Sequence, residues 1–379
     1  MDFNLSEEQL MLRDSMRDFA KERLAPLAEE ADQQGFIHPE IIKELADLGY
    51  CGICTPPEYG GAGFDTVCYA LAIEEVSKVD ASVGVMLSVT NSPVQLPILE
   101  FGSEFLKQKY LPKLASGKSI GAFCLTEANA GSDAANIKLS AELNGDRYVL
   151  NGIKQFITNG TIADIFIVFG VTDKSAGSKG ISAFVVEKNF PGLKIGKIEN
   201  KMGLKASSTT EIIFENCQVP KENLIGEPGQ GYKIALATLD HSRIGIAAQA
   251  LGIAEGAFEQ ALEYSKQRVQ FGKPICQFQA IQFMLSDMAT DIEAARFLIY
   301  NAAWRYDQKQ RVSKEVSMAK LFASEMAFRV VHKALQIHGG YGYMKEYPIE
   351  RMYRDQRATE IYEGTSEVQR IVIANQLLK

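Results

Sequence analysis

The sequence predicts an α+β multidomain protein in which a β-rich region separates two helical regions. Apolar residues recur at helical spacing before residue 121 and after residue 231. Between these positions lie short runs of β-branched and aromatic residues, separated by turn signals. Because a chain of 379 residues exceeds one ordinary hydrophobic core, several packed units are expected. We place the domains at residues 1–120, 121–228 and 229–379.

The first region is predicted to be helical. Ser6 and Gln9 match a capping box, in which two side chains satisfy free amides at a helix start. Residues 41–48 form a second amphipathic pattern that Gly49 ends, and a further helix is predicted over residues 69–79.

Four strands are predicted in the middle region, over residues 148–150, 165–169, 181–186 and 211–214. Turns are expected between them at Asn151-Gly152, Asn159-Gly160 and Pro191-Gly192. No long helical pattern alternates with these strands, which disfavours a parallel Rossmann sheet. An antiparallel barrel or sandwich is therefore expected.

The last region begins with a glycine-rich linker at residues 226–231, which lacks the ending of a phosphate-binding loop. Long helices are predicted after it, over residues 232–268, 278–308, 313–337 and 365–378. Glycines and alanines between residues 245 and 254 predict close helix packing, within the chain or between subunits.

Composition disfavours several classes of function. The net charge is −7 and no basic domain is present to neutralise phosphates, so nucleic acid is not an expected partner. The apolar stretches are too short to span a membrane, and the N-terminus shows no signal or transit peptide. We therefore expect a cytoplasmic protein, with no membrane partner, rather than a mitochondrial-matrix one.

Cysteines and histidines give no sign of redox or metal chemistry. The six cysteines are scattered, which is typical of a reducing compartment. Cys51 and Cys54 have the spacing of a redox pair, but a helical pattern precedes them and prolines follow. The four histidines form no pair at metal-ligand spacing with the cysteines, so no metal site is expected.

Five short motifs carry more information than the overall pattern: LTEANAGSD at 125–133, FITNG at 156–160, RVQFGKP at 268–274, QIHGGYG at 336–342 and IYEGTSE at 361–367. In this order and spacing they resemble the signatures of the acyl-CoA dehydrogenases, closest to the bacterial short-chain, butyryl-CoA-like branch. The resemblance implies an N-terminal helical domain, a middle β-domain and a C-terminal four-helix bundle. It also implies bound FAD and a homotetramer arranged as a dimer of dimers.

The resemblance places the catalytic base at Glu363, with Tyr362 and Gly364 beside the substrate. The family reaction removes an α-proton and a β-hydride from an acyl-CoA thioester, and the flavin accepts the hydride. Some members carry the base on an earlier helix, where this chain has Ser242, and a hydroxyl cannot remove such a proton unaided. The structural alternative is that Glu363 caps the last helix beside Thr365.

The same motifs imply the residues that contact FAD. The flavin ring is expected to lie against Phe123, Leu125, Thr126, Phe156, Ile157 and Thr158. Arg268 is expected at the pyrophosphate, because a planar guanidinium suits phosphate oxygens; otherwise it is a surface cation. The remaining implied contacts, some of them across a subunit boundary, are Ser132, Phe271, Gln279, Gln336, Gly339, Gly340, Thr365 and Glu367.

Substrate contacts are implied for Ser132, Asp240, His241, Ser242 and Arg243. Asp240 and Arg243 match a polar pair near the CoA, although their spacing also fits an ordinary helical ion pair. His241 and Ser242 depart from the run usual in short-chain members, and His241 would place a titratable imidazole beside the acyl pocket. Chain length, branching or a ring in the acyl group stay open.

The expected partners are an acyl-CoA and an electron-transfer flavoprotein. The direction stays open, since related enzymes run as enoyl-CoA reductases, and an alicyclic or branched carboxyl-CoA is the alternative to butyryl-CoA. Acyl-CoA oxidases are usually longer, and a nitroalkane oxidase-like enzyme is expected to carry Asp as its base. The intact Glu363 argues against a catalytically silent flavoprotein.

Overall fold

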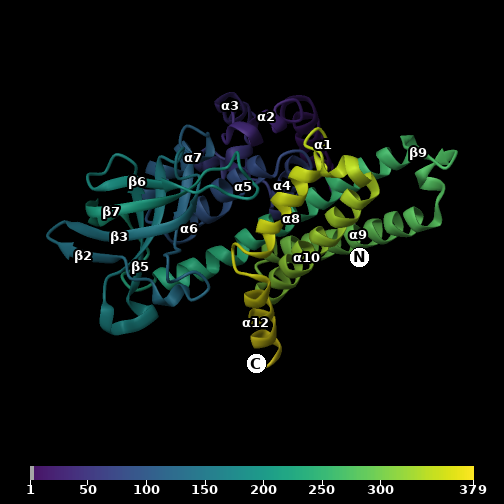
Figure 1. Ribbon diagram of the computed structural model, residues 1–379. Coiled ribbons are helices and arrows are strands. Elements are labelled where there is room, and N and C mark those ends of the chain that lie inside the picture. Colours follow the sequence, from purple (N-terminus) through teal and green to yellow (C-terminus); the bar gives the residue numbers. More distant parts are fainter. Residues whose placement is uncertain (1–3) are drawn as a thin grey trace.

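The computed structural model describes residues 4–379, with helices before and after a β-sheet along the chain (Figure 1). The sheet lies at one end of the molecule, and the long C-terminal helices extend toward the other end. This arrangement confirms the predicted order of helical, β-rich and helical regions.

The N-terminal helices are α1 (Glu7–Phe19), α2 (Ala28–Gln34), α3 (Pro39–Asp47), α4 (Thr66–Ser77), α5 (Ala81–Val89), α6 (Gln95–Phe101) and α7 (Glu104–Ala115). Short π-helical turns at Ala20–Leu24 and Thr90–Val94 follow α1 and α5. The predicted capping box is confirmed, because the Ser6 hydroxyl accepts from the Gln9 amide at 3.2 Å and the Gln9 side chain accepts from the Ser6 amide at 2.9 Å.

The middle sheet contains β1 (Gly121–Cys124), β2 (Ser140–Asn144), β3 (Arg147–Thr158), β4 (Ile165–Val171), β5 (Ile181–Glu187), β6 (Leu193–Ile198), β7 (Thr209–Pro220) and β8 (Leu224–Ile225). The strand order is β6-β7-β3-β2-β4-β5-β8, and β1 pairs with β4. Most pairs are antiparallel as predicted, but β4 pairs in parallel with β1 and, at Val171 opposite Ser140, with β2, so the prediction is wrong for these two pairs. The β2–β3 hairpin supplies the long connection that a parallel pair requires.

One predicted turn is wrong for a local reason. Asn151 and Gly152 lie inside β3, at a register shift opposite β7, rather than between two strands. The actual β2–β3 hairpin turns at Gly145 and Asp146. A bulge and a tight turn use the same residue types, since both need unusual backbone angles, and Gly152 has a φ of 148°.

The C-terminal elements are α8 (Gly231–Gln267), β9 (Val269–Gln270), β10 (Lys273–Pro274), α9 (Gln279–Asp307), α10 (Ser313–His338), α11 (Ile349–Gln356) and α12 (Ser366–Leu377). The four long helices predicted from the sequence are confirmed. The sequence did not predict the β9–β10 hairpin or α11.

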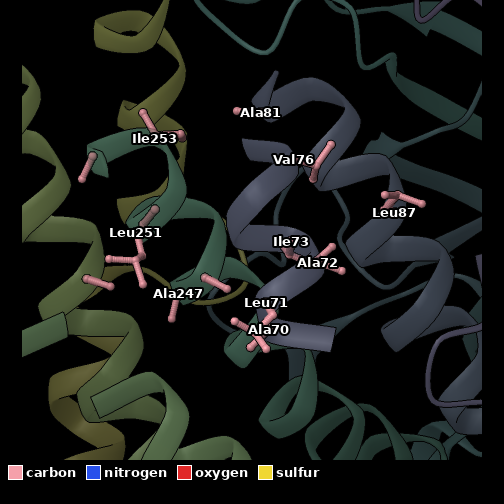
Figure 2. Close-up of a cluster of buried hydrophobic side chains, with 14 of the residues drawn as sticks. Ala70, Leu71, Ala72, Ile73, Val76, Ala81, Leu87, Ala247, Leu251 and Ile253 are labelled. Carbon is pink, nitrogen blue, oxygen red and sulfur yellow. The ribbon is translucent and has the colours of Figure 1, made fainter. Parts of the chain in front are cut away.

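Helix α8 organises the molecule, because it connects the sheet to the far end of the helical region (Figure 1). Its 37 residues extend over about 55 Å. A Cβ atom added at Gly245 would lie 2.0 Å from the Tyr69 hydroxyl oxygen, and one at Gly252 would lie 2.2 Å from the Glu74 carbonyl oxygen. The small residues of α8 therefore allow close packing against α4 of the same chain. Figure 2 shows the apolar side chains that fill this contact, among them Ile73 of α4 and Leu251 of α8.

Candidate active site

The loop between α11 and α12 carries the predicted base in an unusual backbone conformation. Glu363 has a φ of 53° and Gly364 a φ of 92°, so two successive residues are left-handed. A non-glycine residue in this region is uncommon and is found preferentially at functional sites. Thr365 caps α12, with its hydroxyl accepting from the Val368 amide at 3.3 Å. The alternative in which Glu363 caps this helix is therefore wrong.

The Glu363 side chain is half-buried and points to α8. Its Oε2 atom accepts a hydrogen bond from the Ser242 hydroxyl. Burial raises the pKa of Glu363, while the Ser242 hydroxyl, Arg243 and Lys320 act in the opposite direction. A carboxylate with a raised pKa is a stronger base, which suits the removal of a proton from a weakly acidic carbon.

Arg243 connects the loop to the polar pair predicted for CoA. Its guanidinium is buried, donates to the Glu363 carbonyl oxygen at 3.3 Å and pairs with Asp240 at 3.0 Å. Asp240 also accepts from the Ser313 hydroxyl at 2.5 Å. Asp240 and Arg243 thus form the helical ion pair that their spacing also predicted. Contact of either side chain with CoA stays a prediction.

Tyr362 and His241 border the same cluster. The Tyr362 hydroxyl donates to Gln249 Oε1, and its ring packs against both the helical core and the cluster that contains Leu125. His241 is buried against Tyr69, with ring centroids 5.2 Å apart. Burial lowers the pKa of His241 to about 4, so the expectation of an imidazole that titrates near neutral pH is wrong.

The predicted flavin residues of the middle domain lie on two connected segments. The Gln155 amide donates to the Thr126 carbonyl oxygen at 2.9 Å and joins β3 to the loop after β1. Phe156 is left-handed, with a φ of 60°, and its side chain is 60% exposed. The Ile157 side chain is buried in the core, so it can reach a ligand only through its backbone.

The other middle-domain residues differ in exposure. Thr126 and Thr158 are half-buried, Ser132 is exposed, and Leu125 is buried. Phe123 is half-buried, with its ring 5.0 Å from that of Phe169.

A second group of predicted cofactor residues lies at the far end of α8. A cavity of about 490 Å³ is lined by ten residues there, including Arg268, Gly339, Gly340 and Tyr341. Arg268 lies over the Tyr341 ring, 5.4 Å from its centroid. Since Arg268 is the C-cap of α8, 25 residues after Arg243, about 37 Å of helix lies between the residue at this cavity and the one beside Glu363.

Three further residues of this group are exposed and do not line the cavity, namely Phe271, Gln279 and Gln336. Phe271 is 93% exposed and left-handed, with a φ of 52°, so its aromatic ring is open to solvent. Glu367 is exposed in the first turn of α12, where its pKa is lowered and its carboxylate stays charged. Contact of Glu367 with a pyrophosphate stays a prediction, and only its backbone amide suits an anion.

Sequence reasoning missed two buried lysines. Lys154 of β3 donates to the Leu125 carbonyl oxygen and pairs with Glu127, both at 2.9 Å. Lys320 of α10 donates to the Gly364 carbonyl oxygen at 2.8 Å. A signal was available for Lys320, because it follows Val316 by four residues on the apolar face of α10, where a lysine is unexpected.

Other proposed chemistries find no support among residues 4–379. All six cysteines are free, and burial raises the pKa of Cys51 to about 12, the opposite of a reactive thiolate. No group of His, Cys, Asp or Glu side chains within this range could hold a metal ion. No helix in the same range combines the length and apolar character that crossing a bilayer demands.

Comparisons with known proteins identify the family. Models of the N-terminal, middle and C-terminal domains of acyl-CoA dehydrogenases match residues 6–118, 122–217 and 229–378. The chain is 50% identical over 379 residues to the short-chain-specific acyl-CoA dehydrogenase of Clostridium acetobutylicum, covering 100% of both chains. It is 48% identical to the acryloyl-CoA reductase (NADH) of Anaerotignum propionicum, covering 100% of this chain and 96% of that relative.

Two solved structures share the fold over their whole length. Butyryl-CoA dehydrogenase from Megasphaera elsdenii matches with a TM-score of 0.99 at 50% identity, covering 100% of both chains. A chain from a study of the electron-transferring flavoprotein of Acidaminococcus fermentans matches with a TM-score of 0.99 at 53% identity, again covering 100% of both. These findings define a flavin-dependent oxidoreductase whose cofactor is FAD. The chain belongs to the acyl-CoA dehydrogenase family.

Proposed function

We infer that this enzyme dehydrogenates a short acyl-CoA to the 2-enoyl-CoA, with Glu363 as the base. The observation that carries this proposal is the half-buried Glu363 carboxylate, which accepts from Ser242 and has a raised pKa. When bound, FAD supplies the hydride acceptor. Glu363 takes the α-proton of the thioester, and the β-hydrogen leaves the substrate with its electron pair.

The residues around the two segments fit such a cofactor. Phe156 offers an exposed aromatic surface, and Thr126 and Thr158 offer hydroxyls beside it. Arg268 offers a cation at a cavity large enough for part of a nucleotide. Because about 37 Å of helix lies between Arg243, beside Glu363, and Arg268 at the cavity of the same chain, we propose that one flavin site combines residues of two subunits, within a homotetramer arranged as a dimer of dimers.

The substrate is proposed to be short and linear, as in the Megasphaera elsdenii relative that acts on butyryl-CoA. An alicyclic or branched acyl-CoA is the alternative. Relatives near 50% identity carry the names of a dehydrogenase and of a reductase, so identity alone does not choose the direction. Electrons are proposed to pass to an electron-transfer flavoprotein, and the enzyme to act in the cytoplasm.

The substitution Glu363→Gln tests the base directly. We expect the variant to retain FAD but to lose dehydrogenation by about 100- to 10,000-fold, because an amide cannot accept the α-proton. The measurement is the anaerobic bleaching of the flavin by butyryl-CoA. Bleaching at the rate of the unmodified enzyme would end the assignment.

A matched control is Glu360→Gln, which alters a half-buried carboxylate three residues earlier that pairs with Arg357 at 2.9 Å. It should bleach at a rate close to that of the unmodified enzyme. Turnover of linear, branched and alicyclic acyl-CoAs with a ferrocenium acceptor identifies the substrate. Crotonyl-CoA reduction tests the reverse direction, and oxygen consumption by the reduced enzyme tests the oxidase alternative.

A further inference from the structure

Lys320 is a buried cation that the proposed reaction has not yet used. Its side chain is 0% exposed on α10, between Val316 and Ala323 of the apolar face. Lysine is almost never fully buried unless it is paired. Within residues 4–379, however, no carboxylate lies within ion-pair distance of its ammonium, which donates to the Gly364 carbonyl oxygen at 2.8 Å.

The loop that Lys320 contacts is held by donors from three helices. Gln369 of α12 donates to the carbonyl oxygens of Glu363 and Gly364, at 3.3 and 2.9 Å. Arg243 of α8 donates to the Glu363 carbonyl oxygen at 3.3 Å. Two successive left-handed residues are thus fixed through their carbonyls by buried side chains of α8, α10 and α12.

The charges around the loop give the Lys320 ammonium a second effect. The charged groups that act on it are Glu363, Arg243, Glu360 and Glu367. Burial lowers the pKa of Lys320 to about 8, so the ammonium is charged at neutral pH. Its charge favours the ionised form of Glu363, as does that of Arg243, whereas burial opposes ionisation.

We propose that Lys320 is a positioning residue for the dehydrogenation, holding the Gly364 carbonyl and thereby the backbone from which the Glu363 carboxylate reaches the substrate. This proposal rests on the proposed function of Glu363. In this proposal Lys320 contacts neither the substrate nor the flavin. It acts on Glu363 through the backbone of the loop and through its own charge. A catalytic group held loosely by about 1 Å can lose 100-fold in rate, so such support has a measurable effect.

The test is Lys320→Met, which removes the charge and the donor but keeps an unbranched apolar chain. We expect kcat for butyryl-CoA to fall by about 10- to 100-fold. KM should change by less than about threefold, because the substrate site itself is intact. The acid limb of the kcat/KM profile should move up by about 0.5 pH unit or more, since Glu363 loses a stabilising charge. A purely structural role would not move that limb.

The control is Lys333→Met, which removes a more exposed lysine of the same helix that pairs with Asp287 at 2.8 Å. It should leave kcat and the pH profile unchanged. If Lys320→Met does not yield folded protein, Gln369→Met removes the other donor to Gly364 and should lower kcat in the same way. Unchanged kcat and an unmoved acid limb in the folded variant would overturn the proposal.

The result for Glu363→Gln separates the two proposals. If that variant still bleaches its flavin, the proposed function itself fails. If it does not bleach and Lys320→Met retains full kcat, only the role of Lys320 fails.

Discussion

Lys154 and Lys320 occupy equivalent situations in two different parts of the molecule. Each side chain is 0% exposed, and each donates to a backbone carbonyl of a loop that carries predicted site residues. Lys154 is paired with Glu127 at 2.9 Å, whereas Lys320 has no ion-pair partner within residues 4–379. The two regions therefore use the same residue type under different electrostatic conditions.

Glu127, the partner of Lys154, connects several backbone segments, and we call these contacts of Lys154, Glu127, Lys138 and Leu139 the clasp. Glu127 also accepts from the Lys138 and Leu139 amides, at 2.7 and 3.0 Å, and so joins the two ends of the 127–139 loop. The charge of Lys154 is neutralised by the Glu127 carboxylate. The charge of Lys320 has no such partner and acts on Glu363. Both lysines hold a loop through a carbonyl oxygen, and the difference teaches that only the lysine without a counterion also influences a nearby reactive group.

The largest expected effect is on the clasp. Lys154→Met leaves the Glu127 carboxylate without its counterion, so the free energy of unfolding should fall by about 3 kcal/mol. The 127–139 loop then loses its attachment to β3 through Lys154, and FAD should be retained less well. Urea unfolding and the flavin absorbance of the purified protein measure the two effects.

The double substitution Lys154→Met with Glu127→Gln is the control for this prediction. Because it removes both charges, it should regain part of the lost stability. If the losses of unfolding free energy in the two single variants simply add in the double variant, Lys154 and Glu127 are not coupled and the prediction is wrong.

For Lys320→Met the stability effect should be much smaller. One hydrogen bond is lost, but no charge is left unpaired, so unfolding at pH 7 should change by less than about 1 kcal/mol. The pKa of Lys320 is lowered to about 8 in the folded state, so between this pH and its ordinary pKa the unfolded chain binds more protons. The unmodified enzyme should therefore gain stability relative to the variant as the pH rises above about 8. If the unmodified enzyme instead loses stability relative to the variant over this pH range, the account is refuted.

The smallest expected effect is that of Ser242→Ala. The Ser242 hydroxyl donates to the Glu363 carboxylate and favours its ionised form. Its removal should raise the pKa of Glu363 further. The acid limb of the kcat/KM profile should move to higher pH, and a limb that stays in place or moves down would show that the hydroxyl is not bound to the reacting form.

The sequence alone identified features that depend on neighbours along the chain. Helix periodicity located α8, α9, α10 and α12, and the Ser6 capping box was correct. The five motifs indicated the family, because they retain residue types at fixed short spacing. Where one local signal fits two structures, as at Asn151 and Gly152, the prediction was wrong.

Only the tertiary structure decided which charges are buried and what they face. No local pattern distinguishes Lys154 from the surface lysines, and the sequence does not show that His241 is buried against Tyr69. The 37-residue length of α8 likewise separates two groups of predicted flavin residues that the motifs treat alike. The physical reason is that burial and ionisation depend on residues far apart in the chain, which packing alone brings together.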